Sequence, residues 1–361
     1  MGWGGGYTAG MSEIDERLAA FCTAGGHDGV VLRRRGNMSW AGGGSDFHCD
    51  TASSLGIATL VWTPGRKVCW TDTIESPRLT AEEPLTREGW EVEALPWWEA
   101  DTRLASLLAS GRYATDWPVD PLYECRASLT AAEVDRARSL GRETAGVVER
   151  IMREDVKLGM TEFHLGGAVA GWLRDRGIFA HVVLVAADDR IAAYRHPIPT
   201  AKPIERTAMV AVCAQRRGLI VSLTRLVHFG ATLPEDLSRR HAAVIGVDRA
   251  LHGTTRVGRR WCDALADGVR AYAAGGYPDE WTKHHQGGPM GYECRDFKAT
   301  PTETRAVKPR QLVGWNPTVS GTKSEDTILT GTDASAGVEV MTPAGDWPTE
   351  GGRPAILCRK A

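Results

Sequence analysis

Apolar and polar positions divide the chain into two parts with different rhythms. In the first part, up to about Trp117, short apolar runs alternate with turn signals such as Thr63-Pro64-Gly65. These runs predict buried strands, and one stretch with helical spacing ends near Gly111. Strands mixed with helices over about a hundred residues predict a small α/β domain. The expected elements are strands at 30–32, 57–62 and 68–70 and a helix around 104–108.

The second part begins near Cys125, where longer helical patterns appear. Thr130-Ala-Ala-Glu133 is a capping box, which satisfies orphan amides at the start of a helix. Thr161 caps a second helix that runs to about Gly177. A polar turn ending in glycine joins two apolar runs and predicts a hairpin. The other expected elements are strands at 182–185, 209–212 and 219–221 and a long helix at about 237–273.

Composition agrees with two ordinary globular domains. The chain has 361 residues, of which 42% are hydrophobic and 24% charged, with a net charge of −2. This balance argues against nucleic acid or an anionic membrane as the main partner. We therefore expect residues 1–124 to form a leader and an α/β domain. Residues 125–361 are expected to form an α+β domain, with helix pairs on an antiparallel sheet.

Cysteine usage and hydropathy predict a reducing compartment. The eight cysteines form no C-x-x-C pair, so a cysteine-based zinc or redox site is not indicated. No apolar run approaches about twenty residues, and no charged-then-apolar leader is present. The glycine-rich opening reads as a leader or as an early start before Met11. We expect a cytoplasmic protein with no membrane contact and with reduced thiols.

Candidate chemistry lies in loops of the second part. His196 belongs to Tyr-Arg-His-Pro-Ile-Pro at 194–199, between two expected strands, and histidine exchanges protons near neutral pH. A turn built by two prolines, with an incidental histidine, is the alternative. His284 and His285 lie in a glycine-dense stretch that lets a ligand approach the backbone. Side chains at adjacent positions do not converge in a helix or strand, so no metal site is expected there.

The order of these segments resembles the pita-bread family, which includes methionine aminopeptidase, prolidase, aminopeptidase P and creatinase. The loop histidine is followed by Gly-x-x-x-x-x-Thr-Arg at 218–225, His-x-x-Gly-x-x-x-Gly at 284–291 and Glu-Asp-Thr at 325–327. The first part, with Arg-Gly-Asn-Met-Ser-Trp at 35–40, resembles the family's creatinase-type amino-terminal domain. The resemblance implies a pita-bread catalytic domain preceded by that smaller domain. It excludes the single-domain methionine aminopeptidases as closest relatives.

The resemblance also implies that the family's metal site is lost. Its metallopeptidases hold two metal ions with two aspartates, one histidine and two glutamates. At four of these positions this chain has Ala211, Ser222, Gly288 and Asn316, and only Glu325 is kept. One ligand from five cannot hold two divalent ions, because both coordination and charge neutralisation are missing. We therefore expect an enzyme that works without a metal ion and without another cofactor.

The residues that remain have implied roles. His196 falls on the loop histidine that transfers protons in creatinase, and Arg295 falls on an arginine that binds the substrate carboxylate. Glu325 matches an acidic residue that faces the guanidinium group of creatine, but Thr224 replaces a second glutamate, so creatine itself is not expected. The implied catalytic residues are His196 and Glu325. The substrate-binding candidates are Arg295, Lys323, Trp315, Thr224, His284 and Tyr292.

The expected reaction is hydrolysis of a C–N bond, of amide, cyclic amidine or amidino type, in a small carboxylate-bearing molecule. His196 would act as general base and then as general acid. Two alternatives stay open. A lyase or cyclase of a biosynthetic pathway would use the same proton transfer, whereas an inert peptide-binding module would keep only the fold. The resemblance further implies a homodimer in which residues 54–57 of one subunit line the partner's pocket.

Overall fold

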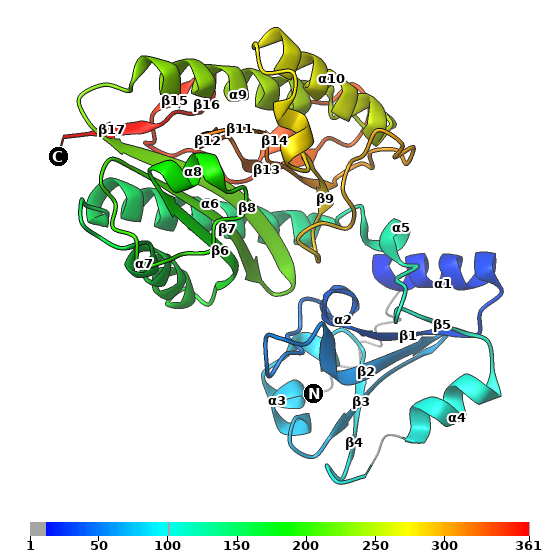
Figure 1. Ribbon diagram of the computed structural model, residues 1–361. Helices are drawn as coiled ribbons and strands as arrows, with labels where there is room; N and C mark the ends of the chain where they lie inside the picture. The colour runs from blue at the N-terminus through cyan, green and yellow to red at the C-terminus, as the bar shows by residue number, and fades with distance from the viewer. Residues whose placement is uncertain (1–11, 100–101, 361) are drawn as a thin grey trace, which may run out of the picture. The chain divides into compact units, whose positions relative to one another are not determined.

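The computed structural model of the protein describes residues 12–99 and 102–360 (Figure 1). The chain divides into two compact units, Met1–Arg126 and Ala127–Ala361, close to the boundary expected after residue 124. The leader expected before Met11 lies outside the described residues.

The amino-terminal unit is built on a five-stranded sheet with the order β4-β3-β2-β1-β5. The pairs β1–β2 and β2–β3 are antiparallel, while β3–β4 and β1–β5 are parallel. The expected strands and helix of this part are confirmed as β1, β2, β3 and α4. Its elements are α1 (Glu13–Gly25), β1 (Gly29–Arg34), α2 (Arg35–Ala41), β2 (Leu55–Thr63), β3 (Arg66–Asp72), α3 (Ser76–Ala81), a short 3₁₀ helix (Pro84–Thr86), β4 (Glu91–Leu95), α4 (Thr102–Ser110), β5 (Tyr113–Thr115) and α5 (Tyr123–Arg126).

The carboxyl-terminal unit contains a larger, mostly antiparallel sheet with the order β6-β7-β8-β13-β10-β9. Strand β14 pairs with β13, and β17 adds to β8 as a parallel strand. Two short hairpins, β11–β12 and β15–β16, complete the strands. Their bounds are β6 (Phe179–Ala187), β7 (Thr207–Arg216), β8 (Leu219–Phe229), β9 (Gly287–Met290), β10 (Leu312–Trp315), β11 (Thr318–Val319), β12 (Thr322–Lys323), β13 (Asp326–Thr330), β14 (Val338–Val340), β15 (Thr349–Glu350), β16 (Arg353–Pro354) and β17 (Leu357–Arg359).

Two helix pairs pack on this sheet, as the sequence predicted (Figure 1). Helices α6 and α7 cover β6, β7 and β8, and α9 and α10 pack on each other beside β10, β11 and β12. The capping box at Thr130 and the cap at Thr161 both form. The helical elements are α6 (Ala131–Arg150), a π turn (Ile151–Asp155), α7 (Glu162–Arg174), α8 (Asp189–Ala193), α9 (Glu235–Thr254), α10 (Trp261–Ala274) and η3 (Glu280–Lys283). The α+β class expected for this part is confirmed.

The single long helix expected at about 237–273 is wrong, because the chain breaks between α9 and α10. Gly258 has φ +84°, a left-handed conformation that suits glycine and ends helical geometry. Its backbone N–H donates to the carbonyl oxygen of Val307 instead of to a preceding turn. The break lets α10 fold back against α9, where Leu251, Trp261 and Trp315 share one buried cluster.

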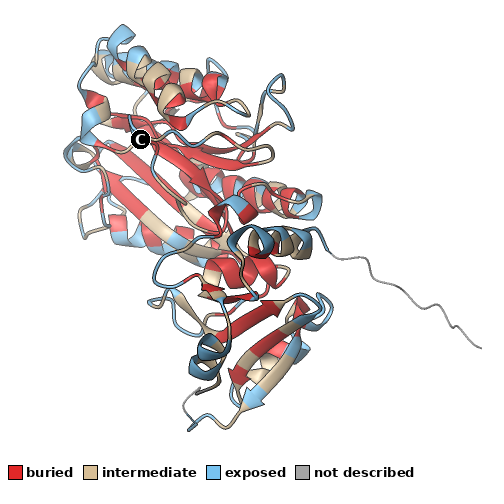
Figure 2. Ribbon diagram, turned by 90° about the vertical axis from the view of Figure 1, so that its right-hand side faces the viewer, coloured by how far each residue is buried: buried red, intermediate tan, exposed pale blue. Residues whose placement is uncertain are grey.

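The β7–β8 hairpin carries the strands that matter most for the site. Its two-residue turn has Arg217 at φ 50° and Gly218 at φ 79°, as expected for a type I′ turn whose twist matches the strands. Ten paired positions follow, with Ala211 opposite Thr224 and Cys213 opposite Ser222. Both strands are largely buried (Figure 2). Among the described residues, no helix is both long and apolar enough to cross a membrane.

Candidate active site

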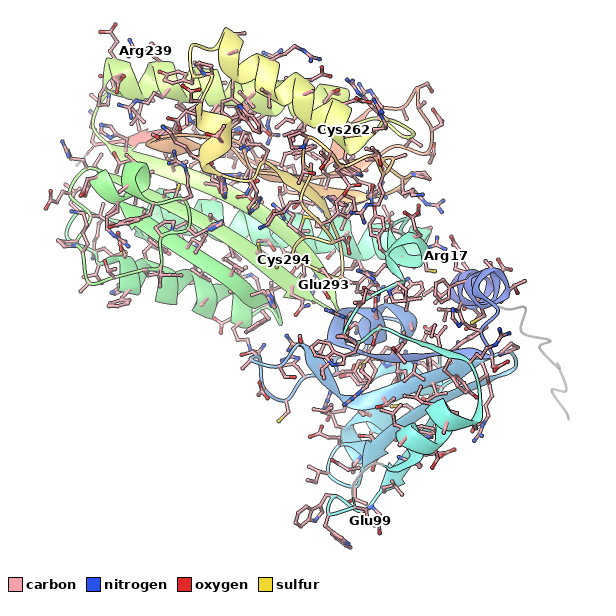
Figure 3. The ribbon with its side chains drawn as sticks, turned by 45° about the vertical axis from the view of Figure 1, so that its right-hand side comes forward. Arg17, Glu99, Arg239, Cys262, Glu293 and Cys294 are labelled. Atoms are coloured by element: carbon pink, nitrogen blue, oxygen red, sulfur yellow. The ribbon has the colours of Figure 1, made fainter. Side chains whose placement is uncertain are left out.

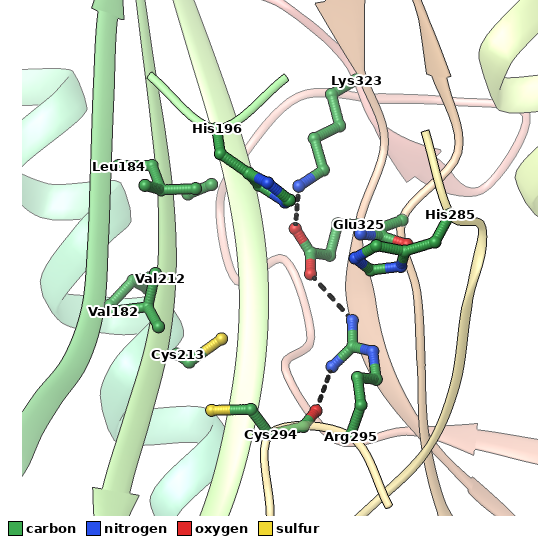
Figure 4. Close-up of a pocket in the computed structure, with 12 residues that line it drawn as sticks. Val182, Leu184, His196, Val212, Cys213, His285, Cys294, Arg295, Lys323 and Glu325 are labelled. Carbon is green, nitrogen blue, oxygen red and sulfur yellow. Dashed lines mark hydrogen bonds and ion pairs between the residues drawn. The ribbon is translucent and has the colours of Figure 1, made fainter. Parts of the chain in front are cut away.

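A pocket of about 160 Å³ opens in the carboxyl-terminal unit, where β6 and β7 face the ends of β10, β12 and β13 (Figure 4). One wall is apolar, and the other carries charged and imidazole groups. The lining residues are Val182, Leu184, His196, Ala211, Val212, Cys213, His285, Cys294, Arg295, Asn316, Lys323 and Glu325.

Glu325 is the central charged group of the pocket. It directly precedes β13, and its carboxylate accepts hydrogen bonds from Lys323 Nζ at 2.7 Å and from Thr224 Oγ1 at 2.7 Å. Arg295 Nη2 lies 3.5 Å from its other oxygen. Burial alone would raise the pKa of Glu325. The cations of Lys323 and Arg295, together with these hydrogen bonds, outweigh burial and lower that pKa to about 2.

Arg295 reaches Glu325 from the segment that follows β9. Its Nη1 also donates to the carbonyl oxygen of Cys294 at 2.6 Å. The guanidinium passes directly over Gly314 in β10, where a Cβ atom would lie 2.7 Å from Cζ. Glycine at 314 therefore leaves the space that Arg295 occupies. Arg295 Nε is buried and has no hydrogen-bond partner among the described residues.

Three histidines meet at the rim of the pocket. His196 lies in the loop after α8, and His284 and His285 lie between η3 and β9. One ligand-type atom from each lies within 4.8 Å of those of the other two. His284 Nε2 is 3.1 Å from His196 Nε2, and His284 Nδ1 is 3.4 Å from Thr318 Oγ1. His284 is buried, His285 is half-buried and His196 is exposed.

The hydrogen bonds around His284 assign its tautomer and that of His196. Thr318 Oγ1 donates its single hydrogen to the carbonyl oxygen of Asn316 at 3.1 Å. Toward His284 Nδ1 the Thr318 hydroxyl can therefore only accept, so Nδ1 carries the hydrogen. His284 Nε2 is then unprotonated and accepts from His196 Nε2–H. His196 Nδ1 is left as the basic nitrogen.

All three imidazoles are held in their neutral form. Burial is the largest cause, and the nearby cations add to it. For His196, desolvation and Lys323 lower the pKa below 6.5, against a smaller opposing effect of Glu325. Burial and Lys323 lower the pKa of His284 to about 2, and burial and Arg295 lower that of His285 to about 4.

The expectation that His284 and His285 would not converge is wrong. That argument holds for regular helices and strands, but these residues occupy the turn between η3 and β9. Their ring centroids are 4.6 Å apart, and His285 is 5.8 Å from His196. His285 is therefore a pocket residue that the sequence did not predict. The doubled histidine next to a glycine-dense turn was the available signal.

Two other expected binding residues lie outside the pocket. Trp315 is fully buried against Trp261, and its indole N–H donates to Thr255 Oγ1 at 2.9 Å, so its ring belongs to the core. Tyr292 is also buried, and its hydroxyl donates to Glu133 Oε1 at 2.6 Å. Both side chains belong to the core and not to the pocket lining, since an aromatic beside a polar motif packs as readily inward as toward a ligand.

Two of the pocket residues carried no sequence signal. Cys213 and Cys294 are far apart in the chain and belong to no motif, yet both line the pocket. Asn316 is buried, and its Oδ1 has no hydrogen-bond partner among the described residues. Thr224, expected to bind substrate, instead holds the Glu325 carboxylate in place.

The metal pair of the pita-bread metallopeptidases does not fit these residues. Ala211 and Asn316 line the same pocket as Glu325, so three of the five ligand positions implied by the resemblance come together here. Only Glu325 offers an anionic oxygen, however, and Lys323 and Arg295 already neutralise it. Two divalent ions need several carboxylates, so this set cannot hold them.

Comparison with known proteins supports the fold directly. No family profile and no curated protein matches the chain. Among solved structures, the dipeptidase PepE from Mycobacterium ulcerans is 16% identical and matches 99% of this chain and 100% of its own, with a TM-score of 0.76. The prolidase from Pyrococcus horikoshii OT3 is 15% identical over 92% and 99% of the two chains, with a TM-score of 0.74.

The same architecture occurs in a protein whose name is not that of a peptidase. The amino-terminal domain of the FACT complex subunit SPT16 from chickpea is 13% identical, with a TM-score of 0.68 over 93% of this chain and 97% of its own. This chain therefore has the two-domain pita-bread fold, as the sequence predicted. The fold alone does not decide between a peptidase-like enzyme and another role.

Proposed function

We propose that this chain is a metal-independent hydrolase that cleaves a C–N bond in a small carboxylate-bearing molecule. The observation that carries the proposal is one pocket in which neutral His196 lies beside the ion-paired group Arg295, Glu325 and Lys323. An inert binding module has no requirement for a base and a charged anchor in the same small cavity.

His196 is suited to activate water. Its lowered pKa keeps it unprotonated at neutral pH, and its Nδ1 is the nitrogen free to accept a proton. In the proposed reaction, a water gives a proton to Nδ1 while its oxygen adds to the carbon of the C–N bond. The imidazolium then passes the proton to the leaving nitrogen as the bond breaks.

Three other side chains would orient the substrate. Arg295 Nη2 is only loosely paired with Glu325 Oε1, at 3.5 Å. The planar guanidinium can therefore also pair with a substrate carboxylate. Glu325 would accept from N–H groups next to the scissile bond. The unpaired Oδ1 of Asn316 is a second acceptor for such a group, since a buried carbonyl oxygen without a partner is costly until a ligand satisfies it.

The charges of the pocket favour an anion over a divalent cation. Lys323, Arg295 and Lys298 all lower the pKa of His196, which means that they repel positive charge at this site. Glu325 is the carboxylate that opposes them there. The same field attracts a carboxylate-bearing substrate.

The test is mass spectrometry of mixtures rich in N-acyl amino acids, cyclic amidines and amidino acids, incubated with the protein and a chelator. The proposal expects one compound to gain water, or to split in two, with the wild type. The His196→Ala variant should lose about 10²–10⁴-fold in rate, which is the usual contribution of a general base. His164→Ala is the matched control, because this exposed histidine lies in α7 and outside the pocket lining.

Other outcomes separate the alternatives. A His196-dependent change that adds no water would replace the hydrolase by a lyase or cyclase. A compound or peptide that binds equally to wild type and His196→Ala, without turnover, would support an inert binding module. Turnover that does not depend on His196 would overturn the assigned base.

One observation favours a second candidate, a hydrolase with one transition-metal ion on the three histidines. The 3.1 Å between the two Nε2 atoms is close to the roughly 3.3 Å that separates ligands in a tetrahedral zinc site. Metal binding would require both Nε2 atoms to be unprotonated. The nearby cations would repel the metal ion. Activity that appears only after Zn²⁺ or Mn²⁺ is added, and that a chelator abolishes, would establish it.

A further inference from the structure

Two cysteines face each other in the wall of the pocket. Cys213 lies in β7, and Cys294 lies in the segment after β9, directly before Arg295. Their sulfur atoms point toward each other (Figure 4). All eight cysteines lie in the described ranges and are free thiols. Cys213 and Cys294 are therefore a reduced pair that the fold brings together from distant parts of the chain.

The groups around this pair make its two members unequal. Cys213, His181 and Arg295 all lie near the Cys294 thiol. These contacts outweigh burial and lower the pKa of Cys294 to about 5. The neighbouring Cys294 and burial raise the pKa of Cys213, with Glu325 adding to the effect. The Cys294 thiol is thus the more acidic and the Cys213 thiol the less acidic member of the pair, the arrangement of an attacking and a resolving cysteine.

The other cysteines differ in burial or position. Cys22, Cys69 and Cys125 are buried in the amino-terminal unit, where burial raises the pKa of each thiol. Cys49 is exposed, and Cys262 lies in α10, away from Cys294 (Figure 3). Both members of the pair are only partly buried and line an open pocket, so a small reagent can reach them.

We propose that Cys294 and Cys213 form an oxidant-sensitive dithiol that a peroxide converts to an intramolecular disulfide. The Cys294 thiolate attacks one peroxide oxygen, the O–O bond breaks, and the departing hydroxide is protonated to water, which leaves a sulfenic acid. The Cys213 sulfur then attacks the Cys294 sulfur, loses its proton, and expels hydroxide as a second water. The two sulfurs supply the two electrons that reduce the peroxide, and a dithiol reverses the reaction by exchange.

The disulfide would act on the proposed substrate anchor. The Cys294 carbonyl oxygen accepts from Arg295 Nη1 at 2.6 Å, so a bond from Cys294 to β7 would fix the backbone that positions this guanidinium. Oxidation would also remove the thiolate charge beside Arg295. The modification site itself does not depend on the proposed reaction, and its test uses no substrate.

The experiment starts from full-length protein reduced with dithiothreitol and then exposed to a small excess of hydrogen peroxide. Peptide mapping should find a Cys213–Cys294 disulfide within the monomer, reversed by dithiothreitol. The Cys213→Ser variant should accumulate a sulfenic acid at Cys294 that dimedone traps, and Cys294→Ser should give neither product. Cys49→Ser is the control and should form the disulfide as the wild type does.

A second measurement needs only the wild type and so is independent of whether a variant folds. Alkylation by iodoacetamide, followed as the ratio of Cys294 to Cys49 labelling, should favour Cys294 by roughly ten-fold at about pH 6 if access is equal. That preference should disappear near about pH 7 and reverse toward about pH 8.5, where ordinary thiols ionise as well and their thiolates are the stronger nucleophiles. Differences in access that do not vary with pH leave this trend unchanged. A ratio independent of pH, or peroxide oxidation of Cys49 or Cys262 while Cys294 stays reduced, would overturn the proposal.

Discussion

Glu325 and Asp326 are neighbours in sequence, but they face opposite sides of the sheet. Successive side chains of an extended strand alternate between its faces. Glu325 points into the pocket, where Lys323 and Arg295 meet it. Asp326 points into a buried network and contacts Arg225 at 3.0 Å and Arg353 at 2.7 Å.

The surroundings of the two carboxylates differ in how completely their polar atoms are paired. Arg225 bridges Asp326 to Glu149, and Arg353 bridges Asp326 to Asp248, so charges of both signs alternate behind the sheet. Thr342 Oγ1 also donates to Asp326 at 2.7 Å. Around Glu325, in contrast, Arg295 Nε and Asn316 Oδ1 have no partner among the described residues. Behind the sheet, Asp248 Oδ1 also lacks a hydrogen bond, but it lies 3.2 Å from His252 Nε2. Paired charges in the core indicate a structural role, and unpaired polar atoms beside an open pocket indicate a place for a ligand.

The largest expected effect comes from breaking the paired charges in the core. Asp326→Ala should lower the free energy of unfolding by about 3–5 kcal/mol, because it removes the buried carboxylate that accepts a hydrogen bond from each of Arg225 and Arg353. Urea denaturation followed by circular dichroism measures this change. Asp189→Ala is the control: its ion pair with Lys202 is exposed, so the urea midpoint should scarcely move. Equal effects of the two variants would contradict the structural role of the network.

The Glu325 side should instead appear in the pH dependence of stability. Its pKa is lowered to about 2 in the folded protein, below the value of 4.5 expected when unfolded. Its ionised form therefore stabilises the fold above about pH 4.5, and this contribution is lost as the pH falls toward about 2. Across that window Glu325→Gln should lose less stability than the wild type, as urea midpoints at several pH values would show.

Glu350→Gln provides the reference for this comparison, because Glu350 is exposed in β15. It should follow the wild-type pH dependence. If Glu325→Gln follows it as well, the ion pairs of Glu325 with Lys323 and Arg295 do not stabilise the fold.

The comparison also shows how far sequence alone could lead. The capping box at Thr130, the hairpin turn at Gly218 and the segment order were predictable, because each depends on local backbone chemistry or on a family pattern. The placement of Glu325 in the site rested on the resemblance alone, since a polar strand start with two acids has no hydrophobic alternation to set the faces of Glu325 and Asp326.

The missed site residues have a related cause. Cys213 and Cys294 meet because β7 and the segment after β9 line one pocket, and no local pattern encodes such a meeting. His285 joined the site through an irregular turn, where periodicity arguments do not apply. Trp315 packed inward because the break at Gly258 brought Trp261 against it. In each case the tertiary fold, and not the segment, determined which atoms are neighbours.

The smallest expected effect is on the titration of His196. Desolvation and Lys323 lower its pKa, while Glu325 raises it. Lys323→Met removes the repelling charge and frees Glu325 from its closest cation, so the His196 pKa should rise toward or above 6.5. Carbon-detected NMR of the imidazole Cε1 measures the shift, with exposed His164 as internal reference and Lys202→Met as the charge-matched control. The variant should then need a higher pH for turnover, because its base is protonated over a wider range. An unchanged or lower His196 pKa would show that Lys323 does not hold this imidazole neutral.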